Sequence, residues 1–395
     1  MSKLIILIIG TRPEAIKMAP VYFALKRNNI PVKICATFQH TNLLQEVFDI
    51  FGIVPDFNLN IMKAGQDISY LTQAVLRETR IVFEQENPSL VLVQGDTTTA
   101  FAAALSAFYL NIEVGHIEAG LRTYDISSPF PEEFNRQAVS LFAKFNFAPT
   151  SLAVQALQRS NIKQDSIFCT GNTIVDALSI MQRKVEQQEV VVSSALKNLV
   201  SQCDTKNQKK ILLTVHRRES FNGGIKRVLE TIKEYALAHP DVFFFYPFHP
   251  NPVVQKAILE VGLKDVNNIY MCEPLLYPDL IYLLVNMDLI LTDSGGIQEE
   301  AISLGKTVLV ARDKTERMEG VNAGIAHLVG TNKRKIKMAL NTYIRRENVE
   351  ATQIYGNGRA AEKIVEIIER NGKAHEKSLC SRTRVHRASN SDHCC

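Results

Sequence analysis

The sequence predicts an α/β protein in which parallel sheets are covered by helices on both faces. Short apolar runs recur along the chain, and many are rich in Val, Ile or Phe without alternating polar residues. Such runs are typical of strands buried on both faces. Segments with helical periodicity lie between them, and this alternation indicates doubly wound layers with right-handed crossovers. A chain of 395 residues is expected to form two domains.

The expected elements follow one another in the order strand, helix, strand. The strands are predicted at residues 4–9, 32–37, 90–94, 112–115, 145–148, 211–215, 242–246, 288–291 and 307–310. The helices are predicted at residues 13–28, 97–110, 131–143, 224–238, 295–304 and 359–370. Pro13 suits a first helical turn, and Ile364, Ile367 and Ile368 form one apolar face of the last helix.

The alternation is interrupted between Gln182 and Gln208, where the chain is polar and has no clear strand. We therefore place the boundary before this segment, with one domain over residues 1–172 and the other over 173–355. The tail at residues 373–395 is basic and has no apolar period, so we expect it to be disordered.

The charge distribution and the apolar segments bear on partners and compartment. The net charge is +4, most of it comes from the tail, and a nearly neutral body gives no reason to expect a nucleic-acid surface. No apolar stretch has the length of a membrane span, and the run at residues 4–9 is too short for a signal peptide. The seven cysteines are an odd number, and the first four are interpreted as buried free thiols of a reducing compartment. These features predict a cytoplasmic protein without membrane or nucleic-acid partners.

Polar residues directly after the first expected strand suit an anion. Gly10 is followed by Arg12 and then Lys17, at a predicted helix N-terminus; a plain turn with solvated cations is the alternative. The segment has neither G-x-G-x-x-G nor a P-loop, so no dinucleotide cofactor and no ATP hydrolysis are expected. Metal-ligand spacings are absent as well, so we expect no metal.

Three carboxylates follow strand ends in the first half of the chain. Asp96 comes after the third expected strand, Glu118 after the fourth, and Glu132 opens a helix with Arg136 one turn later. Asp96 as a helix cap and Glu132 as a first-turn charge are the structural alternatives. If the three carboxylates crowd together, the pKa of at least one should rise, as a general acid near neutral pH requires.

The second half has its own polar residues at strand ends. His216 follows the first strand there, and His249, in a rigid turn, is as well explained by a structural role. Ser294, Gly295 and Gly296 open a helix after a strand, and small residues at such a place let backbone N–H groups approach a phosphate. Glu300 lies about one turn further on, where it could accept hydrogen bonds from ribose hydroxyls. Arg317 adds a cation in a later loop.

Together these segments resemble the non-hydrolysing UDP-N-acetylglucosamine 2-epimerases. The joint order of the matches is specific, although each alone is weak. The matching segments are GTRPEAIKMAPV (10–21), QH (39–40), QGDTTTA (94–100), GHIEAGLRT (115–123), FPEEFNR (130–136), TGNTIVDAL (170–178), TVHRRES (214–220), HPNP (249–252), TDSGGIQEEA (292–301) and TER (315–317). The sequence Arg12-Pro13-Glu14 favours the non-hydrolysing branch, because hydrolysing relatives tend to have an aromatic residue soon after the arginine.

The resemblance implies a glycosyltransferase B type fold, with two Rossmann-like domains facing across a cleft and a returning helix at 356–372 packed on the first. It implies a UDP-sugar substrate, with Ser294, Gly295, Gly296 and Glu300 at the diphosphate and ribose. It places Arg12, Lys17, Arg136, His216 and Arg317 around the substrate. It makes Asp96, Glu118, Glu132 and His216 the catalytic groups. The chain departs from the family at Phe38, Leu280 and Met318, none of which is a proposed catalytic group.

The resemblance also implies a reaction, a homodimer and a regulatory site. The C2 hydrogen of the sugar is not next to a carbonyl, so reversible elimination of UDP to 2-acetamidoglucal is the expected route between UDP-GlcNAc and UDP-ManNAc, supplying ManNAc-type precursors for surface polysaccharide. Gln39, His40 and Gln66 are expected near a site where substrate activates the enzyme. The alternatives are a hydrolysing epimerase, a glycosyltransferase of the same fold and a nucleotide-sugar-binding regulator.

Overall fold

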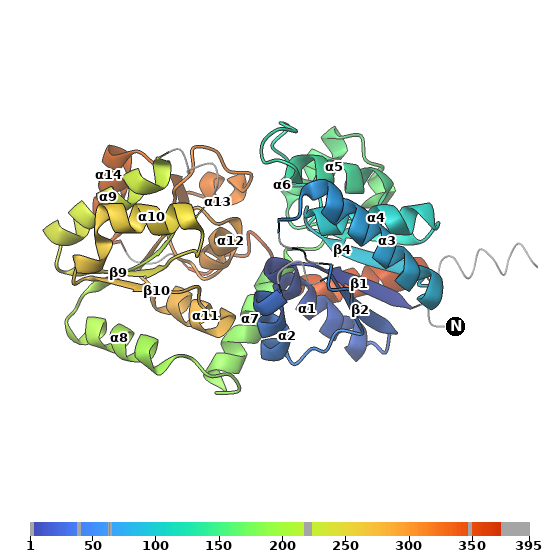
Figure 1. Cartoon of the computed structure of the whole chain (residues 1–395), viewed down its shortest axis with the longest axis horizontal. Coiled ribbons are helices and arrows are strands. Elements are labelled where there is room, and N and C mark those ends of the chain that lie inside the picture. Colours follow the sequence, from blue (N-terminus) through green and yellow to red (C-terminus); the bar gives the residue numbers. More distant parts are fainter. Residues whose placement is uncertain are drawn as a thin grey trace, which may run out of the picture.

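Two parallel sheets form the framework of the molecule (Figure 1). The computed structural model describes residues 4–37, 41–61, 63, 65–216, 223–346 and 350–372. The first sheet has the strand order β3-β2-β1-β4-β5-β6-β7, and the second has the order β10-β9-β8-β11-β12-β13. Every pairing is parallel. In both sheets the strand order reverses beside the first strand, which is the doubly wound arrangement predicted from the sequence.

The strands of the first sheet are β1 (Ile5–Ile9), β2 (Val32–Ala36), β3 (Phe57–Asn58), β4 (Leu90–Gln94), β5 (Glu113–Ile117), β6 (Phe145–Ala148) and β7 (Ile167–Cys169). Those of the second are β8 (Lys209–Thr214), β9 (Val242–Pro247), β10 (Ile269–Cys272), β11 (Leu289–Thr292), β12 (Val308–Val310) and β13 (Ala326–Leu328). The four strands that the sequence did not predict, β3, β7, β10 and β13, are the four sheet edges. Each is short and partly exposed, so it lacks the continuous apolar run of a central strand.

The helices of the first half are α1 (Arg12–Arg27), α2 (Thr41–Phe51), α3 (Ile68–Glu86), α4 (Thr98–Tyr109), α5 (Glu132–Phe142), α6 (Ser151–Arg159) and α7 (Thr173–Glu186). Those of the second are α8 (Ser194–Thr205), α9 (Gly224–Ala238), α10 (Pro252–Val261), α11 (Tyr277–Asn286), α12 (Gly295–Ser303), α13 (Met318–Asn322) and α14 (Lys333–Tyr343). Short 3₁₀ turns cover Gln164–Ser166 and Leu263–Asp265. A last helix covers residues 360–372.

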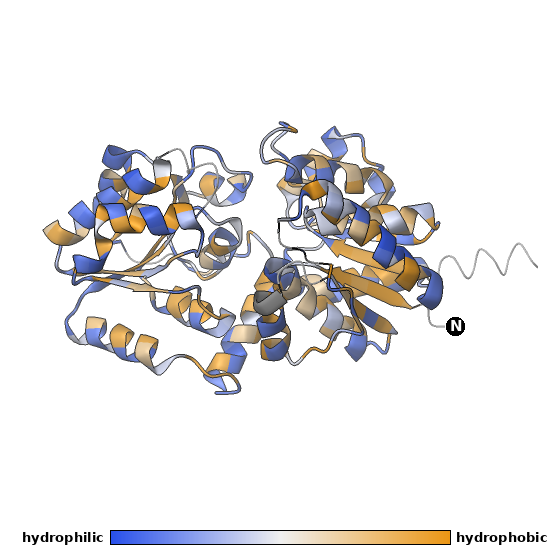
Figure 2. Cartoon of the chain, viewed as in Figure 1, coloured by the Kyte–Doolittle hydropathy of each residue, from blue (hydrophilic) through white to orange (hydrophobic). Residues whose placement is uncertain are grey.

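Each sheet is buried on both faces, as the apolar strands in Figure 2 suggest. Ile5, Leu7 and Ile9 of β1 point into a cluster with α1 and α7, whereas Ile6 and Ile8 point to the opposite cluster under α3 and α4. This alternation follows from the two-residue period of a strand. The first of these clusters continues into the second half through α11 and α12, so one apolar core connects the two sheets.

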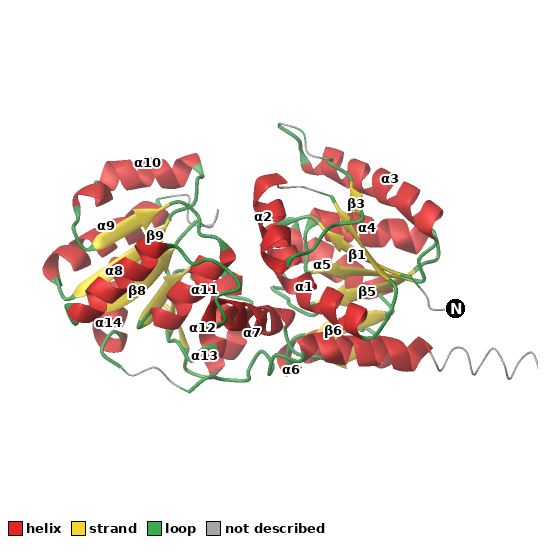
Figure 3. Cartoon of the chain, turned by 90° about the horizontal axis from the view of Figure 1, so that it is seen from below, coloured by secondary structure: helices red, strands yellow, loops and turns green. Residues whose placement is uncertain are grey.

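Helix α7 lies between the two halves (Figure 3) and packs against α1 on one side and α11 and α12 on the other. Its Asp176 carboxylate accepts the backbone N–H groups of Ala360 and Ala361, at 3.2 and 2.9 Å, and so caps the last helix. Ile364 of that helix is buried in the core cluster that contains α1, which agrees with the apolar face predicted for it. The polar stretch from 182 to 208 is mostly helical, ending α7 and forming α8.

The burial of the cysteines differs in part from the sequence prediction. Cys35, Cys169, Cys203 and Cys272 are free, but Cys169 is exposed and Cys272 only half-buried, so the prediction of four buried thiols was wrong for these two. None of the helices in the described part of the chain is long and apolar enough to cross a membrane. The predicted disordered tail at 373–395 lies outside the described residues.

Candidate functional site

A cleft between the two halves is lined by residues that directly follow parallel strands. These strands lie on either side of the point in each sheet where the strand order reverses, which is the switch point of that sheet. In an open α/β sheet, ligands bind where the strand order reverses, beyond the carboxyl ends of the strands. Here β1 and β4 are neighbours in one sheet, and β8 and β11 in the other. The cavity has a volume of about 660 Å³, which is within the range of small-molecule sites. It is lined by Arg12, Lys17, Asp96, Glu118, Glu132, Arg136, His216, Ser294, Gly296, Glu300 and Arg317, all of which the sequence predicted.

Glu14 shapes the loops at the first switch point. Its Oε2 accepts the backbone N–H groups of Gly10 and Thr11 at 2.7 and 2.6 Å, and its Oε1 accepts the Thr97 hydroxyl at 2.5 Å. One buried carboxylate therefore ties the loop after β1 to the loop after β4, and burial raises its pKa despite these hydrogen bonds. The sequence reasoning missed Glu14, although Thr11-x-x-Glu14 has the spacing of a capping box.

Arg12 reaches across the cleft from the first turn of α1. Its Nη2 donates to the backbone oxygen of Leu275 at 2.7 Å, in the segment just before α11. Burial lowers the pKa of Arg12 from its ordinary value, although Glu46 and Glu300 oppose this shift. A guanidinium remains protonated even so, and the cleft therefore retains a positive charge at this contact.

Asp96 pairs with Arg136 of α5, and Glu132 begins the same helix. Arg136 Nη2 lies 2.7 Å from Asp96 Oδ2, and Asn135 donates to the Asp96 backbone oxygen at 2.9 Å. Thr97, and not Asp96, caps α4, because its hydroxyl accepts the Ala100 N–H; the structural alternative for Asp96 was therefore wrong. Glu132 is the first residue of α5, and its buried Oε2 has no hydrogen-bond partner among the described residues.

Glu118 occupies an unusual backbone position directly after β5. Its φ of 63° lies in the left-handed region, which is costly for a residue other than glycine and is often associated with functional sites. The carboxylate is buried, accepts a hydrogen bond from Gln94 Nε2 at 2.8 Å and forms an ion pair with Lys17. The carboxylates Asp96 and Glu118 thus each have a cation as a close neighbour. The close contacts of these two carboxylates are therefore with cations, whereas the sequence led us to expect contacts among the carboxylates themselves.

Lys17 and Arg317 form a buried ionic cluster that spans the cleft. Lys17 Nζ lies 3.7 Å from Glu299 Oε2, and Arg317 Nη2 lies 3.6 Å from Glu118 Oε1. Arg317 Nε also donates to Glu299 Oε1 at 2.8 Å, and Nη1 pairs with Glu316. Burial alone would lower the pKa of both cations, but the surrounding carboxylates outweigh it and raise them.

Glu299 was missed by the sequence reasoning because it stands beside Glu300 at the same helical turn. Only the fold shows that Glu299 points toward Arg317 and Glu300 toward Tyr277.

His216 follows β8 and is oriented by Asp293, which follows β11. Its backbone N–H donates to Asp293 Oδ2 at 2.6 Å, and its Nδ1 lies 3.4 Å from Oδ1 of the same carboxylate. The ring stacks on His249 with 5.2 Å between centroids. Asp293 was missed, but its place immediately before Ser294 at a strand end is a recognisable signal. Both histidines line the cleft.

The Ser294-Gly295-Gly296 turn opens α12 toward the cleft. Ser294 is the N-cap, and no side chain caps its first turn, so the helix presents its N-terminal N–H groups and positive dipole end. Gly295 itself is not among the residues lining the cavity. A Cβ at Gly295 would come within 2.3 Å of the Arg317 guanidinium, so glycine is required for the arginine to lie against the turn.

Glu300 is the buried carboxylate one turn inside α12. The Tyr277 hydroxyl donates to its Oε1 at 2.8 Å. Burial raises the pKa of Glu300 to about 7, although the Tyr277 hydrogen bond acts in the opposite direction. This carboxylate is therefore poised to respond to a hydrogen-bond donor or to a change of pH near neutrality.

Of the three residues expected at a regulatory site, the structure describes only Gln66. Gln39 and His40 lie outside the described residues, and Gln66, which accepts the Lys63 N–H at 3.1 Å, does not line the cleft. In the described ranges no group of three or more His, Cys, Asp or Glu side chains could hold a metal ion.

The sequence of the chain matches one protein family over most of its length. Residues 24–369 match the family model of UDP-N-acetylglucosamine 2-epimerase. The chain is 42% identical over 383 residues to the UDP-N-acetylglucosamine 2-epimerase of Campylobacter jejuni, covering 95% of this chain and 100% of that one. It is 42% identical over 373 residues to the enzyme of the same name from Escherichia coli K12, covering 93% and 98%.

A solved structure gives the same result. The crystal structure of UDP-GlcNAc 2-epimerase from Neisseria meningitidis, bound to UDP-GlcNAc, superposes with a TM-score of 0.86 at 42% identity and covers 93% of this chain and 100% of that one. Its two-domain architecture is the glycosyltransferase B type predicted above. A family match over most of the chain, relatives at this identity and a shared fold lead to one conclusion: the chain belongs to the UDP-N-acetylglucosamine 2-epimerase family.

Proposed function

We propose that this protein interconverts UDP-GlcNAc and UDP-ManNAc by inverting C2 of the sugar without hydrolysing the nucleotide sugar. The observation that carries the proposal is the cleft, where an open helix N-terminus and several cations from both halves face three carboxylates of the first half. Membership of the family supports it, as does the UDP-GlcNAc bound by the relative from Neisseria meningitidis.

In this proposal the second half holds the nucleotide. Ser294, Gly295 and Gly296 bring the N-terminus of α12 to the diphosphate, as helix N-termini do for phosphates. Glu300 accepts hydrogen bonds from the ribose hydroxyls. Arg12, Lys17, Arg136, His216 and Arg317 then surround the diphosphate and the sugar with positive charge. The electrostatic requirement is strongest in the transition state, where UDP leaves as an anion.

The reaction proceeds by elimination and re-addition. A carboxylate removes the C2 proton, the C1–O bond breaks, and its electron pair leaves with UDP, so a double bond forms between C1 and C2. The 2-acetamidoglucal and UDP remain together in the cleft, which excludes water and favours the return reaction. An acid then protonates C2 from the opposite face while the UDP oxygen attacks C1. Overall no atom is gained or lost, and no redox cofactor is needed.

Asp96, Glu118, Glu132 and His216 are the groups that we assign to proton transfer. They approach the cleft from β4, β5, α5 and β8, so they can reach a sugar ring from different sides. Asp96 and Glu118 are held by Arg136 and Lys17. Asp293 orients the His216 ring, which fixes the direction of its exchangeable proton.

Incubation with UDP-GlcNAc alone in deuterated water, followed by NMR, tests the reaction. We expect UDP-ManNAc with deuterium at C2, because the proton removed in the elimination exchanges with solvent before C2 is protonated again. An epimer without deuterium would overturn the elimination route. Free ManNAc with UDP would identify a hydrolase, a requirement for an acceptor would identify a glycosyltransferase, and binding without turnover would identify a regulator.

The remaining features of the proposal concern the setting of the enzyme. We propose domains at 1–172 with the returning helix 356–372, and at 173–355, in a cytoplasmic homodimer. We propose that UDP-ManNAc supplies surface polysaccharide, and that substrate activates the enzyme through Gln39, His40 and Gln66. Limited proteolysis tests the domain boundaries, and the mass in solution tests the homodimer. Product analysis in cells tests the supply of surface polysaccharide, and the dependence of rate on substrate concentration tests the activation.

A further inference from the structure

Tyr277 is the buried first residue of α11, and its hydroxyl reaches a carboxylate of the cleft. Only 1% of the residue is exposed, yet it lines the cleft together with Glu300. The hydroxyl donates to Glu300 Oε1 at 2.8 Å. Burial, and then the nearby carboxylate, raise the pKa of this hydroxyl well above its ordinary value, so it remains a hydrogen-bond donor throughout the neutral pH range. The proposed function assigns no role to this tyrosine.

The ring of Tyr277 lies where the two halves meet. It belongs to the core cluster that connects the two sheets. Its centroid is 6.2 Å from that of the Phe51 ring, which α2 of the first half contributes. In addition, α11 packs against α7, the helix between the halves. A fully packed ring has little freedom to rotate, so the hydroxyl has a fixed place relative to α12.

Glu300 presents its two carboxylate oxygens to different partners. Oε1 accepts the Tyr277 hydroxyl, whereas Oε2 accepts no hydrogen bond within the described part of the chain. Oε2 is not one of the unpartnered atoms that are buried from solvent, so it retains accessible surface on the side of the cleft. A carboxylate accepts hydrogen bonds at both oxygens. The contact with Tyr277 therefore occupies one oxygen, restricts rotation of the carboxylate and leaves the other oxygen for a ligand.

Several charged groups face Glu300, and they act in both directions. Burial raises the pKa of Glu300 to about 7, and the Tyr277 hydrogen bond is the strongest of the contacts that oppose this rise. Lys17 and Arg12 of α1 oppose it less strongly, whereas Glu299, the preceding residue of α12, adds to it. Of these groups, all of them in the described part of the chain, Tyr277 is the one that forms a hydrogen bond with the carboxylate. This contact can therefore be removed without changing the charge of the cleft.

We propose that Tyr277 is a positioning residue of the nucleotide site: its hydroxyl holds Oε1 of Glu300 and so presents Oε2 to the ribose hydroxyls. This inference rests on the proposed role of Glu300 at the ribose and names the residue that prepares it. A carboxylate held in one orientation loses less rotational freedom when it accepts a hydroxyl, so the ligand binds more tightly. The ribose is separated from C2 of the sugar by the diphosphate, so Tyr277 acts on binding and not on proton transfer.

The first measurement follows the titration of Glu300 in the ligand-free chain. Carbon-13 NMR of protein labelled at the glutamate side-chain carboxyl gives the midpoint, and the missing signal in Glu300→Gln identifies the residue. Tyr277→Phe removes the hydroxyl and keeps the ring, so we expect the midpoint to rise by about one pH unit, because the ionised form loses a hydrogen bond. A tyrosine that only fills space predicts the opposite sign, since looser packing admits water and lowers the midpoint.

The second measurement is the kinetics of UDP-GlcNAc turnover from pH 6 to pH 9. At pH 7 the KM of Tyr277→Phe should be about five times that of the wild type, because a rise of about one unit leaves about a tenth of the carboxyl groups ionised instead of about half. The difference should narrow toward pH 9, where the carboxyl is ionised in both proteins. The loss should appear in KM rather than in kcat, as for a contact made equally in the ground state and the transition state.

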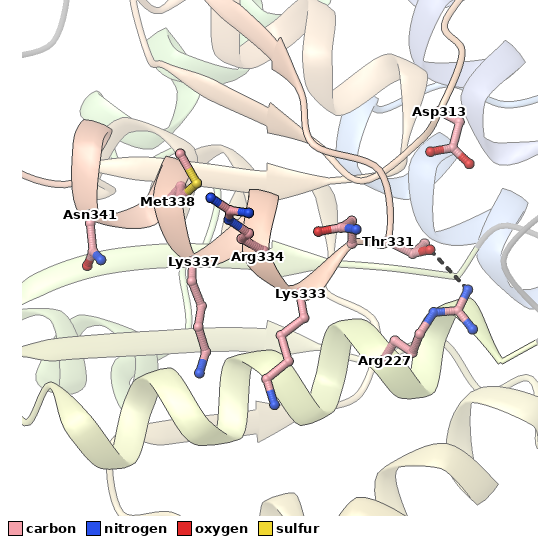
Figure 4. A pocket seen from close by; sticks show the side chains of 9 residues that line it. Arg227, Asp313, Thr331, Lys333, Arg334, Lys337, Met338 and Asn341 are labelled. Carbon is pink, nitrogen blue, oxygen red and sulfur yellow. Dashed lines mark hydrogen bonds between the residues drawn. The ribbon is translucent and has the colours of Figure 1, made fainter.

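Tyr343→Phe is the matched control, because it removes a hydroxyl that is remote from the cleft. The Tyr343 hydroxyl lies 3.2 Å from His327 Nδ1, also in the second half. Its helix α14 lines the open hollow shown in Figure 4, where Lys333 and Lys337 are labelled. None of the residues of α14, every one of which the structure describes, lines the cleft. The Glu300 midpoint and the KM of this variant should therefore be those of the wild type.

A midpoint that is unchanged or lower in Tyr277→Phe would overturn the proposal, and so would a KM equal to that of the wild type at every pH. If Tyr277→Phe does not fold, 3-fluorotyrosine in place of Tyr277 decides instead. Its hydroxyl is the stronger donor, so the midpoint should fall, and an unchanged midpoint rejects the contact. If UDP-GlcNAc is not turned over at all, the proposed function fails. The NMR midpoints, which need no ligand, still decide whether Tyr277 holds Glu300.

Discussion

At the scale of single residues, the three carboxylates of the first half should be indispensable. Asp96→Asn, Glu118→Gln and Glu132→Gln should each lower turnover of UDP-GlcNAc by about a hundredfold or more, because each removes a group suited to proton transfer. Circular dichroism should show an unchanged fold. Glu113→Gln is a matched control, because Glu113 lies at the start of β5 and pairs with Lys144 away from the cleft. Rates like those of the wild type in all three variants would refute the assignment of the site.

Glu300 should make substrate binding depend on pH. Burial raises the pKa of Glu300 to about 7 in the free protein, and hydrogen bonds donated by the ribose hydroxyls would favour the ionised form. Binding should therefore tighten as pH rises from about 6 to about 8, since a growing fraction of the protein already has the required carboxylate. UDP-GlcNAc is a suitable probe, because its diphosphate diester does not titrate in this range.

The measurement is the KM for UDP-GlcNAc from pH 6 to pH 8 in the wild type and in Glu300→Gln. The variant has no carboxylate to titrate at this position, so its KM should be higher and nearly independent of pH. The same slope in both proteins would show that another group causes the dependence.

At the scale of elements, α7 and the last helix are joined by a carboxylate whose protonation should affect stability. Burial raises the pKa of Asp176 to about 6, although the N–H groups of Ala360 and Ala361 oppose the shift. A raised carboxyl pKa means that the folded state binds a proton more readily than the unfolded state. The ionised group therefore costs stability, and this cost grows as pH rises from about 4 to about 6.

Asp176→Asn should remove this dependence. Relative to the variant, the wild type should gain about 1 kcal/mol as pH falls from 7 to 5, since only about one pH unit of this interval lies below the folded pKa and one pKa unit corresponds to about 1.4 kcal/mol. Thermal midpoints of both proteins at the two pH values measure the difference. Asp165→Asn, on an exposed 3₁₀ turn, is the control and should show no such change. A constant difference between the wild type and Asp176→Asn would contradict the prediction.

At the scale of the whole molecule, the expected homodimer can be tested at an apolar surface on α4 and α5. Phe108, Tyr109 and Leu141 are 50%, 63% and 73% exposed, and the Phe108 ring lies 5.0 Å from that of Phe142 between the two helices. We expect light scattering to give about twice the chain mass of 44.3 kDa. Leu141→Asp should shift the mass toward the monomer, because a charge would be buried in the contact. Leu237→Asp, also at an exposed position, should not.

The basic tail should be dispensable for catalysis. Removal of residues 374–395 deletes half of the net positive charge of the chain but none of the residues that line the cleft. Epimerase activity and the thermal midpoint should therefore remain those of the full chain. A large loss of activity would show that the tail has a role in the enzyme.

The sequence predicted the central strands and missed the edges for one physical reason. A strand with neighbours on both sides and helices on both faces must be apolar along its length, as β1 and β4 are. An edge strand such as β3 or β13 is short and half exposed, so its pattern resembles that of a loop. Asp96 was ambiguous for another reason, because spacing alone does not distinguish a helix N-cap from a residue that lines the cleft. The structure shows that Thr97 is the N-cap of α4.

The sequence by itself determined the fold class and most of the polar residues that line the cleft, because the loops that follow parallel strands converge on one edge of a sheet. Only the tertiary structure decided which charges meet. Lys17, Glu118, Glu299 and Arg317 are far apart in the chain, and their pairing depends on how the two halves pack around α7. The strength of an ionic contact depends on distance and on the exclusion of water, and neither is encoded in local sequence pattern.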